Sequence, residues 1–510
     1  MKKILSYTFI ILLIIYIIFI TLSYFNIISK YTFHFEIFAL LLAFLAIFIF
    51  RDNKKFKLNK FLILIPLILI LTVRVMPYIN NNTPLGYDTG IYKYIAENYK
   101  DNLPNIPEFQ LDDWIRANHE PGLFVFTDIL YLIGFNTNQI LTYFLVLLEL
   151  LLVLVIYMTV NKFFNKNTAI ISLFIYAASI TQLKTFEYMY YKNILGLIFL
   201  LFSFYFIKSK KYTSLIIAGT FLAILHRPTF LIFALSYFIY FFFDLEEWKP
   251  NIISGILIIT LALPFYITRL KEMIVNNLEP LIEANIGAGT FITFFQYQFL
   301  ILAYLPFAFL GAFYLIKKKN YNILLIWFII NFILVFFKLI FYNRFIIHLD
   351  IVMIILASLG TIYLIENKKL IGTISIIILL TSSLFIVFNE SINAKPLVSD
   401  RELNIIKDIS KTEENSYVMS TTSYYSPWLL GYSKRKTIAP GLFDYDQWSK
   451  EEWIKFYNLT DKKTIIQMFS NYTKTIYLFV GEHQADYINN KPCFEIYLEK
   501  EKTKIYRYIC

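Results

Sequence analysis

Charged residues are scarce in this sequence. Asp, Glu, Lys and Arg make up 16% of the 510 residues, whereas 58% are hydrophobic. A soluble protein of average composition has roughly 25% charged residues. Apolar runs long enough to cross about 30 Å of hydrocarbon, roughly 20 residues as helix, recur between Ile4 and Phe388. This composition excludes an ordinary soluble protein and predicts a membrane protein with many spanning helices.

Three further absences narrow the class. No small-x-small cleavage site follows the apolar stretch that ends near Phe25, so we expect a retained anchor rather than a signal peptide. No internal repeat is evident, so the inverted-repeat signature of many transporters is missing. The net charge of +11 comes from short Lys and Arg clusters between apolar runs, which is typical of cytoplasmic loops. That arrangement argues against nucleic-acid binding.

The apolar runs predict about thirteen crossings. We expect them at residues 4–25, 35–50, 60–79, 139–160, 168–182, 193–208, 213–225, 229–243, 251–267, 297–316, 321–340, 345–365 and 370–388. The basic clusters occupy alternate loops, so the positive-inside rule predicts a cytoplasmic N-terminus in the cell membrane. An odd number of crossings then predicts that the segment after residue 388 is extracytoplasmic.

We therefore expect a mainly α-helical transmembrane bundle over residues 1–388 and a small extracytoplasmic α/β domain over residues 389–510. Two large outer loops are expected at residues 80–121 and 268–296. In the C-terminal segment, alternation predicts strands at Thr475–Val480 and Phe494–Leu498, and residues 450–457 are expected to be helical.

The only two cysteines, Cys493 and Cys510, lie in the last segment. If a hairpin turns at Glu501 and Lys502, the cysteines face each other, and a disulfide is permitted outside the cytoplasm. Two unrelated free thiols are the alternative, because Glu-Lys is a poor two-residue turn.

Several cations break the positive-inside rule, because they fall at the expected outer ends of helices or in outer loops. They are Arg74, Lys184, Lys192, Arg227, Arg269 and Arg344. Carboxylates expected on the same side are candidate partners: Asp88, Asp112, Asp113, Glu120, Asp128 and Glu187. Interfacial snorkelling explains any one cation by itself. Together they suit an anionic headgroup, such as the phosphate of a long-chain lipid.

Three ionisable residues fall within apolar helices. We expect Lys338 and Asp350, on either side of the turn that carries Arg344, to form a buried ion pair. Glu149 is expected to hydrogen-bond to a neighbouring helix. So few ionisable residues at midplane argue against an open transport pathway.

The segment from Pro84 to Asn98 places Asp88 just after a membrane helix and just before a helix with Tyr92, Ile95 and Ala96 on one face. This resembles the first outer loop of the GT-C-type integral membrane glycosyltransferases. That superfamily includes protein O-mannosyltransferases, aminoarabinose transferases and oligosaccharyltransferases.

Three later segments are similar to the same superfamily. His119–Phe124 is similar to its proline-containing start of an interfacial helix, here at about 123–134. Leu225–Thr229 is similar to its short hairpin with a basic residue, and Asn343–Ile346 to its Arg-Phe at the start of a late helix. The order and sidedness of these motifs carry the resemblance across nearly the whole chain.

The sequence also departs from the family pattern. Thr89 follows Asp88 where a second acid is common, two additional helices precede the acidic loop, and the C-terminal segment lacks the Trp-Trp-Asp motif of oligosaccharyltransferases. These differences indicate a divergent member, argue against oligosaccharide transfer to asparagine, and leave a metal site in doubt.

The resemblance implies a glycosyltransferase that moves a sugar from a polyprenyl-phosphate carrier to a glycan, lipid or protein acceptor on the outer face, with inversion. Asp88 would be the general base. The residues implied at the donor phosphate are Arg344 first, then Arg227, Lys192 and Arg269. Those implied to position acceptor or sugar hydroxyls, or to hold a divalent cation with Asp88, are Asp112, Asp113, His119 and Glu120. A solvated loop or a helix cap is the alternative for the Asp112 and Asp113 pair.

Two other functions fit the same features. One is a transporter or flippase for lipid-linked sugars, which also needs outer cations and many helices. The other is a catalytically inactive GT-C-like assembly subunit, which the absence of a second acid after Asp88 keeps open.

Overall fold

The computed structural model describes residues 2–25, 32–49, 57–79, 81–100, 120–267, 292–340, 342–420, 422–438, 448–449, 452–453, 455–456, 461–482, 488–489 and 491–510. The chain divides into two compact units. Unit 1 comprises Met1–Pro77, Glu120–Leu123 and Val146–Ala394, and unit 2 comprises Tyr78–His119, Phe124–Leu145 and Lys395–Cys510. The expected domain boundary at residues 388 and 389 stays a prediction; the division into units nearest to it falls between Ala394 and Lys395. The first outer loop, however, groups with the C-terminal residues.

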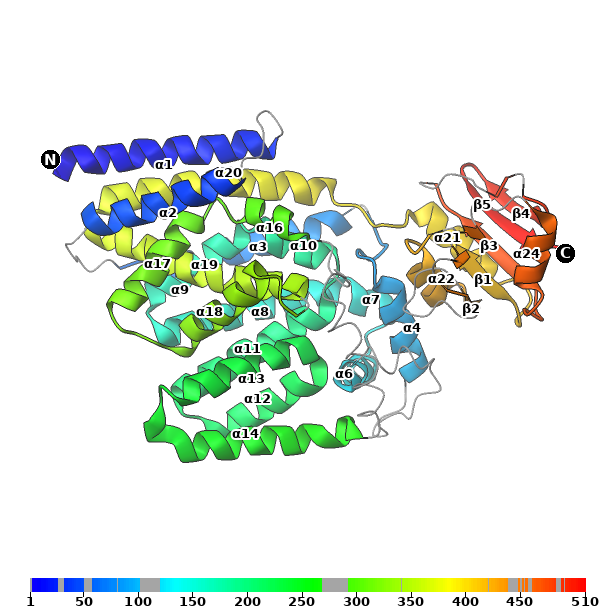
Figure 1. The fold of residues 1–510 in the computed structure, drawn as a ribbon, viewed down its shortest axis with the longest axis horizontal. Coiled ribbons are helices and arrows are strands. Elements are labelled where there is room, and N and C mark those ends of the chain that lie inside the picture. Colours follow the sequence, from blue (N-terminus) through cyan, green and yellow to red (C-terminus); the bar gives the residue numbers. More distant parts are fainter. Residues whose placement is uncertain are drawn as a thin grey trace. The chain divides into compact units, whose positions relative to one another are not determined.

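Each of the thirteen expected apolar segments forms a helix or a broken helix in the described part of the chain (Figure 1). The first three are α1 (Lys2–Tyr24), α2 (Thr32–Ile49) and α3 (Leu64–Val75), the last flanked by short 3-10 turns η1 (Lys60–Ile63) and η2 (Met76–Tyr78). The next are α7 (Thr137–Leu141) with α8 (Tyr143–Phe163), α9 (Lys166–Ala177) with α10 (Ile180–Glu187), α11 (Tyr191–Ser209), α12 (Tyr212–Leu225), α13 (Arg227–Phe241), and α14 (Trp248–Ala262) between η3 (Leu245–Glu247) and η4 (Leu263–Phe265). The last are α16 (Phe294–Leu300) with α17 (Leu305–Lys317), α18 (Ile323–Phe336), α19 (Tyr342–Asn367) and α20 (Lys369–Asn393).

The helices differ in whether they are long enough to cross a bilayer. Among the described residues, seven helices meet the length and hydropathy requirement, and two bent pairs, α9 with α10 and α16 with α17, bring the number to nine if each pair is one span. The chain is therefore a multi-pass membrane protein. Four of the expected crossings are shorter apolar helices: His34–Ala46, Tyr212–Leu225, Arg227–Phe241 and Ile323–Phe336. A fifth short apolar helix, α6 (Pro121–Leu132), corresponds to the expected interfacial helix.

Helix α19 is the centre of unit 1, because all of its apolar window is buried. It packs against α17 with the two backbones in contact. A Cβ on Gly311 would lie 2.0 Å from the Leu356 carbonyl oxygen, and one on Gly360 would lie 2.0 Å from the Phe307 carbonyl oxygen. Small residues at such crossings allow close packing between membrane helices, where van der Waals contact rather than the hydrophobic effect drives association.

The expected ion pair between Lys338 and Asp350 is not formed, and that prediction is wrong. Lys338 is exposed and its ammonium lies 5.7 Å from the centre of the Phe294 ring. Asp350 is buried and accepts hydrogen bonds from Ser179 Oγ at 2.9 Å and Gln182 Nε2 at 2.7 Å, and also from the Tyr304 hydroxyl. Three uncharged donors therefore satisfy this carboxyl group.

The prediction for Glu149 is confirmed. Its carboxylate accepts a hydrogen bond from Tyr176 Oη at 2.8 Å and lies 3.4 Å from Nε of Arg74. Both ionic side chains are fully buried. This buried pair ties α8 to α3 and α9.

Unit 2 contains a five-stranded sheet in the order β2-β1-β3-β5-β4. The strands are β1 (Tyr417–Ser420), β2 (Lys436–Thr437), β3 (Ile476–Val480), β4 (Phe494–Lys500) and β5 (Thr503–Tyr508). β1 pairs in parallel with β2 and β3, and β5 pairs antiparallel with β3 and β4. The helices of this unit include α4 (Thr89–Tyr99), α21 (Asp400–Ile409), α22 (Ser426–Tyr432) and α24 (Lys462–Phe469). Both expected strands are present, and the described residues of the expected 450–457 helix are helical.

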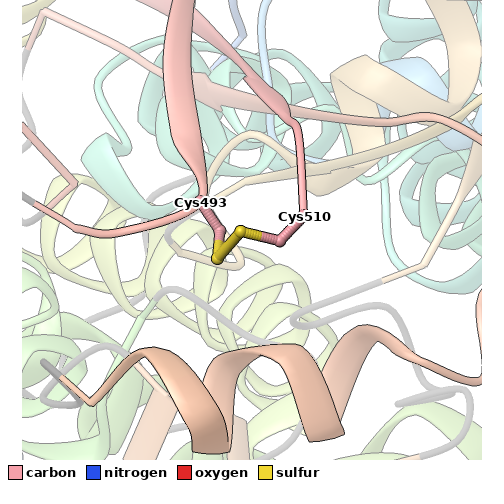
Figure 2. Close-up of a disulfide and its surroundings, with 2 residues drawn as sticks. All are labelled: Cys493 and Cys510. Atoms are coloured by element: carbon pink, nitrogen blue, oxygen red, sulfur yellow. A yellow bond between two sulfur atoms is a disulfide. The ribbon is translucent and has the colours of Figure 1, made fainter.

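The last two strands form the expected hairpin. Lys500 pairs with Thr503, so Glu501 and Lys502 make the turn, and Glu501 takes a left-handed conformation with φ 55°. Cys493 and Cys510 are joined by a disulfide at the open end of the hairpin (Figure 2). The structure thus decides between the two alternatives for these cysteines in favour of the bond.

Candidate functional site

Glu120 of unit 1 contacts two of the cations that break the positive-inside rule. Its Oε2 lies 3.0 Å from Lys192 Nζ, and its Oε1 accepts from the backbone N–H of Arg227 at 3.3 Å and from Nε at 3.4 Å. Glu120 as a whole is only 2% exposed. The start of α6 touches the end of α12, since a Cβ on Gly122 would lie 2.7 Å from the Ile224 carbonyl oxygen. This close contact positions Glu120.

The two cations keep Glu120 ionised. Burial alone would raise the pKa of this carboxyl, but the charges of Lys192 and Arg227 outweigh burial and hold the pKa well below its usual range. Among the described residues, the Glu120 carboxylate contacts both cations. Since both cations are only partly buried, the cluster is accessible to an anion.

A buried hydrogen-bonded chain links this cluster to α19. The Thr229 hydroxyl lies 2.6 Å from Nδ1 of His226 and 3.0 Å from Nε2 of His348. Gly196 leaves the space for it, because a Cβ there would lie 2.9 Å from Thr229 Oγ1. A hydroxyl can donate to one imidazole and accept from the other, so both of these hydrogen bonds can form when both rings are neutral.

Arg344 belongs to the same neighbourhood. It lies in the first turn of α19, four residues before His348, and is partly buried. Burial lowers the pKa of the His226 imidazole well below its usual value; Glu120 opposes this effect, whereas the charges of Lys192, His348 and Arg344 add to it. His226, between α12 and α13, is therefore neutral.

The three cations share one structural feature. Lys192, Arg227 and Arg344 each lie in the first turn of a helix, namely α11, α13 and α19. The first N–H groups of a helix lack intrahelical partners and carry the positive end of its dipole. Lys192 and Arg227 contact Glu120, and Lys192 and Arg344 act electrostatically on His226, the residue before Arg227. This arrangement is suited to hold a phosphate or another oxyanion.

Asp88 belongs to unit 2, where it immediately precedes α4. It is half-buried, and its backbone carbonyl accepts from the Tyr92 N–H at 2.9 Å. The preceding Gly86 has φ 83°, which permits the turn into the helix. Thr89, in the place of a second acid, donates from its hydroxyl to the Leu85 carbonyl and so stabilises the same turn.

Four of the candidate residues lie outside the described part of the chain: Arg269, Asp112, Asp113 and His119. Among the residues that the structure does describe, no group of three or more His, Cys, Asp or Glu side chains could hold a metal ion. Of the nine candidates, the structure brings together Glu120, Lys192, Arg227 and Arg344 in unit 1 and describes Asp88 in unit 2.

Lys184, another of the cations that break the positive-inside rule, also has acidic partners. Its ammonium lies 2.8 Å from Glu187 and 2.6 Å from Glu390. Lys184 and Glu390 line a cavity of about 310 Å³ with apolar and aromatic side chains, among them Tyr24 and Phe299. With two carboxylates beside it, Lys184 is less suited to an anion than the cluster at Glu120.

The sequence did not reveal the roles of His226, Thr229 and His348. The spacing contained part of the information, since His348 follows Arg344 by four residues and therefore lies on the same helix face. The contact between Thr229 and His348, however, joins residues 119 positions apart. It is visible only in the folded chain.

No protein-family model matches the sequence, and no curated protein is detectably similar to it in sequence. Solved structures do share its fold. Oligosaccharyltransferase AglB from Archaeoglobus fulgidus, in complex with an inhibitory peptide and a dolichol-phosphate, aligns at a TM-score of 0.65 and 13% identity over 84% of this chain and 70% of that one. ArnT from Cupriavidus metallidurans, bound to undecaprenyl phosphate, aligns at 0.57 and 11% identity over 88% of this chain and 97% of that one.

A third structure, the mycobacterial arabinofuranosyltransferase AftD, aligns at a TM-score of 0.56 and 12% identity, and covers 90% of this chain and 40% of that one. The chain therefore has the GT-C fold of integral membrane glycosyltransferases, as its motifs predicted. The low identity fits a divergent sequence.

Proposed function

We propose that this protein is a membrane glycosyltransferase that transfers a sugar from a polyprenyl-phosphate-linked donor to an acceptor hydroxyl on the extracytoplasmic face of the membrane. The shared fold supports this proposal, and so do the ligands of two fold neighbours, dolichol-phosphate in AglB and undecaprenyl phosphate in ArnT. Its main support in this chain is the cation cluster, in which Lys192 and Arg227 contact Glu120 and Arg344 acts electrostatically on the neighbouring His226.

The cation cluster binds the donor phosphate in this proposal. Guanidinium groups and helix N-termini provide preorganised N–H donors for the negative charge that develops on the leaving phosphate. Glu120 orients Lys192 and Arg227, because its buried carboxylate already contacts both. Its part is therefore to hold these cations rather than to contact sugar hydroxyls. Arg269 remains a predicted further phosphate ligand.

Asp88 acts as the general base. Its carboxylate takes the proton from the acceptor hydroxyl while that oxygen forms a bond to the anomeric carbon. The bond from the anomeric carbon to the phosphate oxygen breaks, and its electron pair leaves with the phosphate, so the configuration inverts. Such a base contributes about 10²–10⁴-fold in rate. A phosphate is a good leaving group and needs no acid to protonate it. Asp112, Asp113 and His119 remain predicted to position hydroxyls.

Transfer of radiolabelled sugar from polyprenyl-phosphate donors in membranes tests the proposal. We expect Asp88→Asn to lower kcat by about 10²–10⁴-fold with little change in donor KM. Arg344→Ala should raise the donor KM, lower kcat, or do both. Glu495→Gln is the matched control, since Glu495 lies on β4 and is exposed. It should transfer at the wild-type rate.

Wild-type transfer by Asp88→Asn would remove the proposed base. Movement of the sugar-lipid across the membrane without transfer would instead establish a flippase, and wild-type membranes that neither transfer nor translocate any donor would favour an inactive assembly subunit.

A further inference from the structure

Two glycines of unit 2 bring α4 and α22 into backbone contact. A Cβ on Gly90 would lie 1.8 Å from the Pro427 carbonyl oxygen, and one on Gly431 would lie 2.3 Å from the Gly90 carbonyl oxygen. Real Cβ atoms do not approach other atoms this closely, and the atoms they would meet belong to the backbone. Neither helix can therefore accept a larger residue here without moving. Gly90 follows Asp88 by two residues.

Hydrogen bonds on the N-terminal side of Asp88 reinforce this contact. The Tyr87 hydroxyl donates to the Ser423 carbonyl oxygen at 2.6 Å, and the Thr83 hydroxyl donates to Asp400 at the start of α21. The Asp88 turn is thus joined to the C-terminal part of the chain both before and after the carboxylate.

Apolar contacts and a cation–π contact complete the joint. Ile91, Ile95 and Leu430 belong to one buried cluster, so these residues of α4 pack on α22, which lies beside α4 in Figure 1. The Lys93 ammonium lies 5.0 Å from the centre of the Tyr432 ring. Contacts with α22 thus continue along α4 from Gly90 to Ile95 rather than stopping at its first turn.

Helix α22 is itself anchored in the core of the C-terminal sheet domain. Trp428 and Leu429 belong to a buried cluster with Phe479 of β3. The preceding Tyr425 is fully buried and donates its hydroxyl to Glu402 of α21. The position of α4 is therefore set by a packed core more than 300 residues further along the chain.

We propose that the C-terminal domain positions the catalytic base, and that Gly431 is the positioning residue through which it acts. This inference rests on the proposed function, because it takes Asp88 as the base. A Cβ on Gly431 would lie 2.3 Å from the Gly90 carbonyl oxygen, whereas ordinary van der Waals contact begins at 3.4 Å. The methyl group and the carbonyl must therefore separate by about 1 Å. α4 and the adjoining Asp88 turn take up that movement.

Misplacing a reacting group by 1 Å can cost about 10²-fold in rate. We expect Gly431→Ala to lower kcat by about 10–100-fold. The donor KM should stay within about twofold, because the cations proposed to bind the phosphate belong to unit 1. Gly255→Ala is the matched control: its Cβ would lie 3.7 Å from the Tyr237 ring, an ordinary contact. Both variants are measured in the full-length protein in membranes, with their melting temperatures.

A double substitution separates positioning from general damage. If Gly431 acts through Asp88, then adding Gly431→Ala to Asp88→Asn should leave the residual transfer rate unchanged, because the misplaced group is already inactive. A further loss of 10-fold or more in the double variant would show that Gly431→Ala damages something else, and would overturn the inference.

Tyr87→Phe decides the matter should Gly431→Ala fail to fold, since it removes one hydrogen bond without adding an atom. It should lower kcat by about 2–10-fold at unchanged donor KM, and its effect should also vanish in the Asp88→Asn background. Suppose that Asp88→Asn is inactive, as the proposed function requires. A wild-type kcat for Gly431→Ala then overturns the inference. If Gly431→Ala does not fold, a wild-type kcat for Tyr87→Phe overturns it. An active Asp88→Asn refutes the proposed function itself.

Discussion

Replacing Glu120 by Gln tests the electrostatic structure of the cation cluster. The substitution keeps the size of the side chain and one carbonyl oxygen, but it removes a buried carboxylate that contacts both Lys192 and Arg227. Lys192 and Arg227 would then lose this negative charge in a region where the Glu120 side chain is 3% exposed and theirs are 15% and 23% exposed.

The expected cost follows from burial. Breaking a buried ion pair by removing one partner typically costs 3–5 kcal/mol. Because the two cations retain some contact with solvent, we expect the lower end, about 3 kcal/mol. If the unfolding barrier bears the whole loss, thermal inactivation becomes about 10²-fold faster, since each 1.36 kcal/mol is a factor of ten. We also expect weaker donor binding, because the two cations lose their fixed orientation.

The measurement is the half-life of monodisperse protein at a fixed temperature, followed by size-exclusion chromatography of detergent extracts. Lys192→Met and the double variant with Glu120→Gln complete a cycle, for which we expect a coupling of about 0.5–3 kcal/mol. Glu246→Gln, at a residue that is exposed in η3, serves as control. A wild-type half-life for Glu120→Gln, or a coupling near zero, would refute the electrostatic account.

The pH dependence gives an independent check with a definite sign. The folded-state pKa of Glu120 is depressed, so its contribution to stability is present above the unfolded value of about 4.3 and is lost only as the pH falls through the folded value. The difference in stability between wild type and Glu120→Gln should therefore be constant from about pH 5 to 8. A difference that changes over that interval would contradict the assigned ionisation.

Two further predictions concern parts of the fold away from the cation cluster. Cys510→Ser removes a disulfide whose cysteines are 17 residues apart, and a bond that closes a loop of this length contributes about 3 kcal/mol. The C-terminal domain should therefore become more sensitive to protease. In the presence of a reductant, the wild type should be as sensitive as the variant. Asp350→Asn turns an amide N–H₂ toward donors such as the Tyr304 hydroxyl and should cost about 1–3 kcal/mol, seen as a lower melting temperature. An unchanged melting temperature would show that these hydrogen bonds contribute nothing.

The helices were predictable because the information for them is local. Each depends on a run of apolar residues whose length matches the bilayer, and each expected run corresponds to a helix or to a helix pair bent at a break. The breaks themselves were not predicted. The break between α9 and α10 has Ser179 as the N-cap of the second helix and Asp350 as its partner, so it depends on a residue 171 positions away.

Polar partners within the membrane unit were predicted less well. Glu149 could be expected to find a partner on another helix, since a lone carboxyl in an apolar helix is costly. The choice of partner was not accessible: Lys338 is close to Asp350 in sequence, yet Asp350 is satisfied by Ser179, Gln182 and Tyr304. Closeness in sequence does not predict which side chains come into contact when three helices pack together.

The sequence by itself determined a multi-pass membrane protein with a GT-C fold, a set of cations that break the positive-inside rule, and an acid just before α4. Hydropathy, charge placement and short motifs contain this information because each acts over a few neighbouring residues. Only the tertiary structure decided that Glu120 holds Lys192 and Arg227, and that Gly431 touches Gly90. Those contacts join residues 72, 107 and more than 300 positions apart, and they exist only once the helices have packed.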